Sequence, residues 1–128
     1  LVWFINPKYM QGFFTDPRHE MCQFEATLFR AARIIVDTGL HIGDLSFDEA
    51  VAFMEQRANL PAPTARAEVG RYCSWPTQAA AYLTGCLEIL RIRERYLKEG
   101  RGSLREFHDR LGSSGALPIA LAEQVALR

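Results

Sequence analysis

The fold is decided by one stretch of the chain, Arg30-Ala31-Ala32-Arg33-Ile34-Ile35-Val36-Asp37-Thr38-Gly39-Leu40-His41. Its polar residues follow one another at helical steps of three or four, so that a helix places them on one face: Arg30, Arg33, Asp37 and His41. The rest of the stretch is apolar, and a helix that is apolar around most of its circumference is usually buried. Since a buried charge normally needs a partner, the polar stripe is either a structural ion-pair ladder or the wall of a binding site.

Length and composition set the broad class of the protein. The chain has 128 residues, enough for one domain with a hydrophobic core, and 48% of them are apolar and 23% charged, as in soluble globular proteins. The formal net charge is zero, which gives no electrostatic argument for nucleic acid or an anionic membrane as a partner. No apolar run reaches the length of a membrane span. We therefore expect neither nucleic acid nor a membrane as partner.

The cysteines and the start of the chain bear on its origin. Cys22, Cys73 and Cys86 match no disulfide framework or zinc ribbon, so a reduced compartment such as the cytoplasm is the simplest reading, with localisation left open. The chain opens on an apolar run without methionine, and aromatic residues recur as far as Phe14. We expect residues 1–15 to be an irregular lead-in and the chain to be a fragment of a longer protein.

Capping signals divide the remainder into helices. Asp16-Pro17 is a helix start, and Ser46 and Ser103 each open a capping box with a glutamate three residues later. No stretch alternates with period two for long enough to indicate a strand. We therefore predict a single all-α domain over residues 1–128, a bundle of five to six helices. The expected helices run from Pro17 to Gly39, Ser46 to Ala58, Thr64 to Trp75, Pro76 to Glu99, Ser103 to Gly112, and from Pro118 onward.

One short motif resembles a zinc site but is incomplete. His19-Glu20 followed by Gln23 has the spacing of the zincin helix, in which histidines at i and i+4 bind zinc. Glutamine is a poor zinc ligand, so an exposed first helical turn is the better interpretation. His108 is expected to be a surface or packing histidine, and no serine or cysteine lies in the context of a nucleophile elbow. The chain alone supplies no complete catalytic set and, we expect, no metal.

A second polar cluster lies on the third expected helix and the start of the fourth. Its members share one helical face or lie a turn further on, and they are Glu68, Arg71, Tyr72, Trp75, Gln78 and Tyr82. Tyrosines and an arginine directed into one cleft could stabilise an oxyanion or hold a carboxylate. The alternative is a layer of core tyrosines packed around Pro76.

Several stretches together resemble a known family. Residues 30–41 resemble its pattern R-A-x-R-L-V-V-D-T-G-L-H, and residues 68–85 its pattern E-V-x-R-Y-x-x-W-P-x-Q-A-x-x-Y-x-x-G. Residues 45–50, 104–109 and 115–118 are similar to its shorter motifs. The family is the bacterial domain-of-unknown-function family 885, and the resemblance extends over roughly residues 12 to 125.

The resemblance implies a function for a longer parent protein. Full-length members carry an H-E-x-x-P-G-H zinc motif and an E-G-W-A segment upstream of this region, and the fold is similar to helical zinc carboxypeptidases of the thermostable type. Neither motif occurs here. The chain is thus expected to be the C-terminal, substrate-side helical portion of a zinc-dependent peptidase-like protein, inactive alone. By that analogy His41, Tyr72 and Tyr82 face the cleft and a peptide-like substrate, with Arg71 and Gln78 as second choices. Arg30, Arg33 and Asp37 would form a structural ion-pair stripe.

The rival hypothesis is a stand-alone helical binding or assembly module without catalysis. On either hypothesis exposed apolar surface should recruit a partner, either a second copy of the chain or the missing N-terminal half. We expect the aromatic residues Trp3 and Phe4 to be central to that association.

Overall fold

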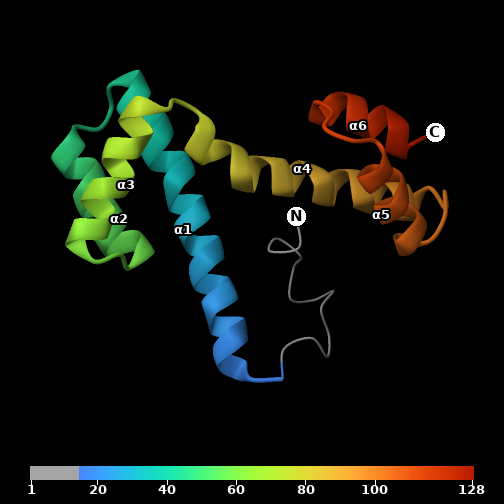
Figure 1. Cartoon of the computed structure of the whole chain (residues 1–128), viewed down its shortest axis with the longest axis horizontal. Helices are drawn as coiled ribbons and strands as arrows, with labels where there is room; N and C mark the ends of the chain where they lie inside the picture. The colour runs from blue at the N-terminus through green and yellow to red at the C-terminus, as the bar shows by residue number, and fades with distance from the viewer. Residues whose placement is uncertain (1–14) are drawn as a thin grey trace. The chain divides into compact units, whose positions relative to one another are not determined.

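A computed structural model describes residues 15–128, and within that range the chain is all helical, with no strand (Figure 1). The all-α prediction with five to six helices is confirmed. The predicted lead-in, with Trp3 and Phe4, falls almost entirely outside the described residues. The helices are α1 (Pro17–Ile42), α2 (Phe47–Ala58), α3 (Ala62–Ser74), α4 (Gln78–Lys98), α5 (Leu104–Ser113) and α6 (Ile119–Ala126).

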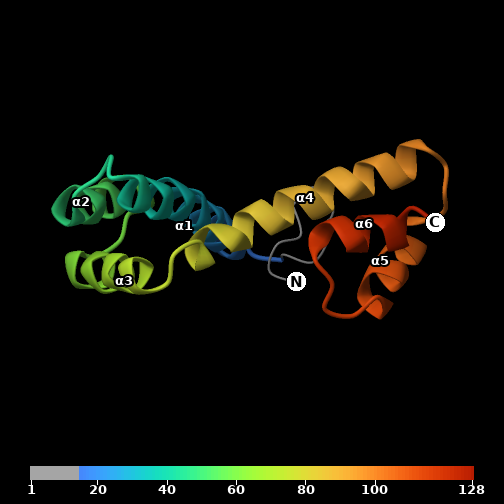
Figure 2. The ribbon, with the colours of Figure 1, turned by 90° about the horizontal axis from the view of Figure 1, so that it is seen from above.

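The described residues fall into two compact units, the first ending at Leu83 and the second running from Thr84 to Arg128. In the first unit α1, α2 and α3 pack against one another, which both ribbon views show (Figures 1 and 2). Its core is formed by apolar residues of these helices and the first turn of α4: Ala32, Val36, Ala50, Val51, Met54, Ala58, Ala65, Val69, Tyr72 and Ala79. The expected single domain stays a prediction.

Helix α1 continues past the glycine at which the sequence suggested its end. Gly39 lies buried inside the helix, and the left-handed C-cap is Gly43, whose φ is 83° and whose backbone N–H bonds to the Gly39 carbonyl. A Cβ at Gly39 would lie 2.7 Å from Leu45 Cδ1. Gly39 is therefore needed for close approach of the following loop, and His41 lies within the last helical turn.

Local caps explain where α2 and α5 begin. Ser46 and Glu49 form the predicted capping box at α2, with the backbone N–H of Ser46 donating to Glu49 Oε2 over 2.9 Å. Ser103 and Glu106 form the second box at α5. Helix α3 differs from the prediction. The sequence indicated a helix that starts at Thr64, whereas α3 begins at Ala62 after Pro61 and has no side-chain cap.

The second unit has a smaller core of its own. Ile92 and Tyr96 of α4, Phe107 of α5 and Ala126 of α6 are fully buried. The rings of Tyr96 and Phe107 are tilted against each other with centroids 5.4 Å apart. The Tyr96 hydroxyl donates to the Arg101 carbonyl over 3.1 Å, which satisfies the polar end of a buried ring.

One face of α1 is apolar and exposed. Its residues recur at steps of three, four or seven, and the exposed fractions are 62% for Met21, 53% for Phe24, 50% for Leu28, 53% for Ile35 and 65% for Ile42. This is the spacing at which a helix presents a continuous seam to a second helix. We call these five residues the α1 stripe. None of the described helices is both long and apolar enough to cross a membrane.

Candidate functional site

Asp37 of α1 connects this helix to the start of α4. Its Oδ1 accepts the backbone N–H of Thr77 over 3.1 Å, and its Oδ2 accepts the backbone N–H of Ala80 over 3.2 Å. The Asp37 side chain is only 3% exposed. A carboxylate at this place satisfies free N–H groups at a helix start and is favoured by the positive end of the helix dipole. Asp37 thus acts as a helix cap supplied from a distant part of the chain.

His41 lies one turn after Asp37 and points its Nδ1 back at it. The Nδ1 atom is 2.7 Å from the Asp37 carbonyl oxygen and 3.1 Å from Asp37 Oδ1. Because both partners are acceptors, Nδ1 carries the proton and Nε2 is left as an acceptor when the ring is neutral. The side chain is 33% exposed. His41 is therefore held in one orientation and remains open to solvent.

Arg33 is buried among aromatic rings. Only 6% of the residue is exposed. Its guanidinium carbon lies 5.2 Å from the ring centroid of Phe29, 5.5 Å from that of Tyr72 and 4.8 Å from that of Tyr82. Cation–π attraction operates at these distances. The Arg33–Asp37 ion pair that helical spacing suggested is not formed, because the Asp37 oxygens are engaged at the start of α4.

Arg30, the third member of the predicted ion-pair stripe, also makes a different contact. Its Nη1 donates to the Ala26 carbonyl over 2.7 Å, one turn earlier in α1. The three residues of the predicted stripe therefore make three different kinds of contact. Arg30 binds a backbone carbonyl, Arg33 lies among aromatic rings, and Asp37 caps α4.

Glu68 of α3 organises the second predicted cluster. Its Oε2 accepts from Arg71 Nη2 over 2.6 Å and from the Tyr72 hydroxyl over 2.8 Å. Burial raises the pKa of Glu68, but the hydrogen bonds from Arg71 and Tyr72 and the positive charges of Arg71 and Arg33 outweigh it, so that the pKa lies below its ordinary value. Glu68 is therefore held as a carboxylate.

The same contacts shift the two partners of Glu68. Burial, followed by the hydrogen bond to Glu68 and its negative charge, raises the pKa of Tyr72 far above its ordinary value. The hydrogen bond to Glu68 likewise raises the pKa of Arg71. Tyr72 is completely buried. Its hydroxyl is therefore a fixed hydrogen-bond donor.

Gln78 extends this network to Tyr82. Its Oε1 accepts from Arg71 Nη1 over 2.8 Å, and its Nε2 donates to the Tyr82 hydroxyl over 2.9 Å. Tyr82 is 42% exposed and the Arg71 side chain 30% exposed. The chain of hydrogen bonds thus runs from a partly buried carboxylate to groups that solvent or a ligand can reach.

The structure brings four of the five predicted site residues into one network and places the fifth beside Asp37. Glu68 joins Tyr72 to Arg71, and Gln78 joins Arg71 to Tyr82. Arg33 lies against the rings of both tyrosines. Sequence reasoning missed Phe29 as a wall of this cluster. The sequence could have indicated this contact, because Phe29 lies four residues before Arg33 and residues at i and i+4 are neighbours on a helix.

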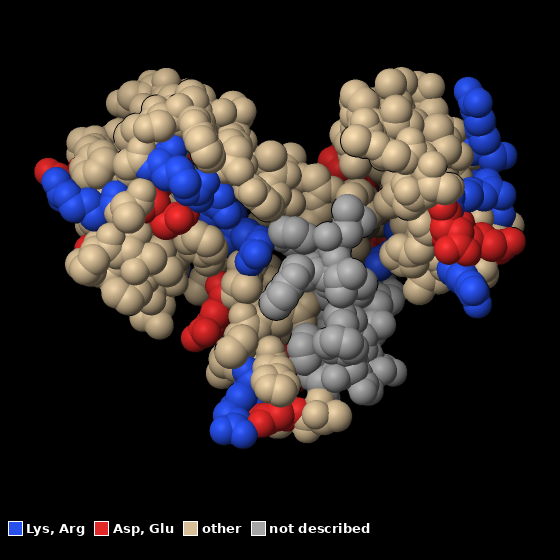
Figure 3. Space-filling model, in the orientation of Figure 1, with Lys and Arg blue, Asp and Glu red and all other residues tan. Residues whose placement is uncertain are grey.

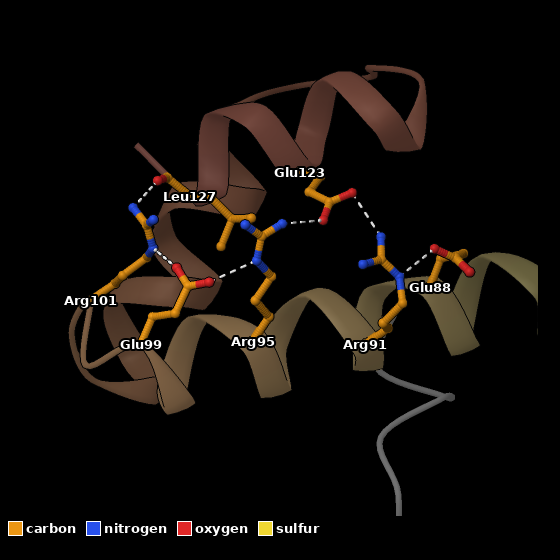
Figure 4. A network of polar contacts seen from close by, with 7 residues as sticks. All are labelled: Glu88, Arg91, Arg95, Glu99, Arg101, Glu123 and Leu127. Atoms are coloured by element: carbon orange, nitrogen blue, oxygen red, sulfur yellow. Dashed lines mark hydrogen bonds and ion pairs between the residues drawn. The ribbon is translucent and has the colours of Figure 1, made fainter.

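Acidic and basic residues are mixed on the face of the molecule that Figure 3 shows. On the face shown in Figure 3, basic and acidic atoms lie beside one another in both units, and most of the face carries neither. In the second unit Arg91 pairs with both Glu88 and Glu123, and Arg95 with Glu123 and Glu99 (Figure 4). Arg101 pairs with Glu99 and donates to the Leu127 carbonyl. Of these contacts, the Arg91–Glu123 and Arg95–Glu123 pairs join α4 to α6.

The described residues do not fit a resident zinc ion. Over residues 15–128 no three His, Cys, Asp or Glu side chains gather as metal ligands. His19 and Cys22 are exposed residues on the first turns of α1, and His108 is exposed on α5.

The fold and this network define an all-α protein with a buried, aromatic-enclosed arginine beside a partly exposed arginine, glutamine and tyrosine. The sequence matches the family described as "Bacterial protein of unknown function (DUF885)" over residues 8–125, and the chain belongs to that family. No curated protein and no solved structure matches the chain.

Proposed function

We propose that this chain is the substrate-side helical portion of a zinc-peptidase-like protein and that its own residues bind a peptide-like substrate. The observation that carries the proposal is the hydrogen-bonded series Arg71, Gln78 and Tyr82, anchored on partly buried Glu68 and partly open to solvent. Guanidinium and phenol groups fixed in this way can donate to a carbonyl or carboxylate oxygen. Zinc, implied for longer relatives by the family resemblance, has no ligand set among the described residues.

Each residue of the network has a proposed part. Arg71 and Tyr82 contact the substrate, because they are the more exposed members. Gln78 holds both of them through its amide. Tyr72 is a positioning residue, since its buried hydroxyl donates to the carboxylate that also pairs with Arg71. His41 offers Nε2 as an acceptor from the last turn of α1.

The experiment compares this chain with the full-length product of its gene. Zinc is measured by elemental analysis in both, and hydrolysis of N-blocked peptides is measured in the longer product. We expect zinc and hydrolysis in the longer product and no zinc in residues 1–128. Tyr82→Phe or Arg71→Gln in the longer product should lower kcat/KM by about tenfold or more. Arg66→Gln, which removes an exposed arginine that stacks on Phe47, is the matched control.

Two results would overturn the proposal. Stoichiometric zinc in residues 1–128 would direct attention to His19, Cys22, His41 and His108 as ligands. Neither zinc nor hydrolysis in the longer product would favour the second candidate function, a helical binding or assembly module. The observation that favours this alternative is the exposed α1 stripe, whose heptad spacing suits a second helix, and we propose a second copy of this chain as its partner.

A further inference from the structure

Arg33 carries a charge that no carboxylate of the described chain neutralises through a hydrogen bond. The residue is 6% exposed, and its Nε is buried without a hydrogen-bond partner. The two carboxylates of this region are engaged elsewhere. Glu68 binds Arg71 and Tyr72, and Asp37 caps α4. A buried cation of this kind is stabilised only in part by aromatic faces.

The three rings around Arg33 differ in how far they are exposed. Phe29 is partly buried and Tyr72 completely buried, whereas Tyr82 is 42% exposed. The Tyr82 ring centroid lies 4.8 Å from the Arg33 guanidinium carbon. Tyr82 is therefore the most accessible of the three rings that contact the Arg33 guanidinium, and its hydroxyl accepts from Gln78 Nε2.

We propose that Arg33 is the anchor of a carboxylate-binding site covered by Tyr82, and that the carboxylate is the C-terminus of a peptide. Only the peptide origin of the carboxylate rests on the function proposed above. The atom left without a partner is Nε, and a planar carboxylate matches the paired Nε and Nη donors of one guanidinium edge. The Tyr82 ring moves aside as the carboxylate enters, and Arg71, already paired with Glu68, lies within the same network.

A carboxylate-binding Arg33 and a purely structural Arg33 should respond differently to an added anion. A carboxylate that reaches Arg33 supplies the hydrogen bond and the negative charge that residues 15–128 do not give to its Nε. Glu68 does sense the Arg33 charge, which contributes to lowering the Glu68 pKa, but it makes no hydrogen bond to Arg33 among those of the described residues. A bound anion should therefore be detectable at Arg33 Nε–H itself.

The test titrates residues 1–128 with acetyl-dialanine, with its C-terminal amide and with acetate, and follows the Arg33 Nε–H resonance in a nitrogen–proton correlation spectrum. The resonance is assigned by its loss in Arg33→Lys. We expect the peptide acid to shift this resonance and the amide to bind about tenfold or more weakly. Acetate should bind more weakly than the peptide acid, because it lacks the remaining contacts.

Variants separate binding from folding. Arg33→Met keeps an apolar side chain of similar length among the rings and should weaken binding of the peptide acid by about tenfold or more, with a thermal melt to verify that the variant is folded. Arg66→Gln removes a charge that also stacks on a ring, but an exposed one, and should change the affinity by less than about twofold.

Three results would overturn the assignment or its peptide source. An unmoved Arg33 resonance, or equal affinity for the acid and the amide, would overturn the carboxylate site. Acetate binding as tightly as the peptide acid would overturn the C-terminal source. The titration measures neither zinc nor hydrolysis. A failure of the peptidase proposal and a failure of this site would therefore appear in different experiments.

Discussion

Asp37 Oδ2 accepts the backbone N–H of Ala80 over 3.2 Å, and this contact joins residues that are 43 positions apart in the chain. With the Thr77 contact, it makes one buried side chain of α1 the cap of α4. Thr77, the residue before α4, has a left-handed backbone conformation with a φ of 70°. The start of α4 is therefore decided by tertiary structure.

Replacement of Asp37 by alanine should destabilise the first unit. The change removes two hydrogen bonds from backbone N–H groups to a carboxylate at the start of α4, so we expect a loss of about 2–3 kcal/mol in the free energy of unfolding. Chemical denaturation followed by circular dichroism measures it. Asp48→Ala, which removes an 86%-exposed carboxylate, should cost less than about 1 kcal/mol. Equal effects of the two changes would contradict the cap.

Two glycine replacements should act in opposite directions. In Gly39→Ala the new Cβ would lie 2.7 Å from Leu45 Cδ1 and 2.9 Å from Leu45 Cγ, and we expect a loss of about 1–3 kcal/mol. In Gly70→Ala nothing lies within 4 Å of the new Cβ, so the better helix propensity of alanine should give a gain of up to about 1 kcal/mol. Thermal unfolding of both variants measures the difference. A gain for Gly39→Ala would show that the loop after α1 is not held against this residue.

Tyr72 should make the fold sensitive to alkali. Its pKa is raised above the ordinary value of 10.0, so the folded state holds this proton more tightly than the unfolded state does. The contribution is fully present below about pH 10 and declines as the pH rises further, by up to about 1.4 kcal/mol per pH unit. Tyr72→Phe should lower stability near neutral pH by about 1–2 kcal/mol, because Glu68 loses a hydrogen bond.

The measurement for Tyr72 is the free energy of unfolding of both proteins at several pH values above 9. The decline with pH should be shallower in Tyr72→Phe than in the parent protein. Parallel declines would mean that other groups govern the alkaline loss, and that the hydroxyl of Tyr72 is not shielded as the structure has it.

The α1 stripe should support self-association of residues 1–128. Ile35→Glu places a charge on a 53%-exposed position at the middle of the stripe and should shift the assembly toward monomer. Leu87→Glu, at a 54%-exposed leucine of α4, is the matched control and should leave assembly unchanged. Sedimentation velocity over a range of concentrations reports both. A parent protein that is monomeric throughout the range contradicts the prediction.

Local signals in the sequence predicted most of the helices and only part of the site. The capping boxes at Ser46 and Ser103 are complete within four residues, so their helices begin where expected. Gly39 and Gly43 carry the same local signal for a helix end, and packing of Leu45 against Gly39 decides between them. Helical spacing grouped Arg71, Tyr72, Gln78 and Tyr82 into one cluster, and the DUF885 resemblance pointed to the same residues because they stand in its longer motif.

Partners from distant segments account for what spacing did not predict. Arg33 and Asp37 have the i,i+4 separation of an ion pair, but the pair competes with other partners. Asp37 gains two backbone N–H groups at the start of α4, and Arg33 gains the rings of Tyr72 and Tyr82. No rule of helical spacing contains these residues, because they approach α1 only when the first unit is folded.

The cap on α4 also has a consequence for the order of folding. The carboxylate of Asp37 is synthesised about forty residues before the N–H groups that it binds, and those groups gain their acceptor only after α1 has docked. The first turn of α4 should therefore be among the last ordered parts of the first unit. In pulsed hydrogen exchange during refolding, the Thr77 and Ala80 amides should therefore become protected at the time when α1 docks.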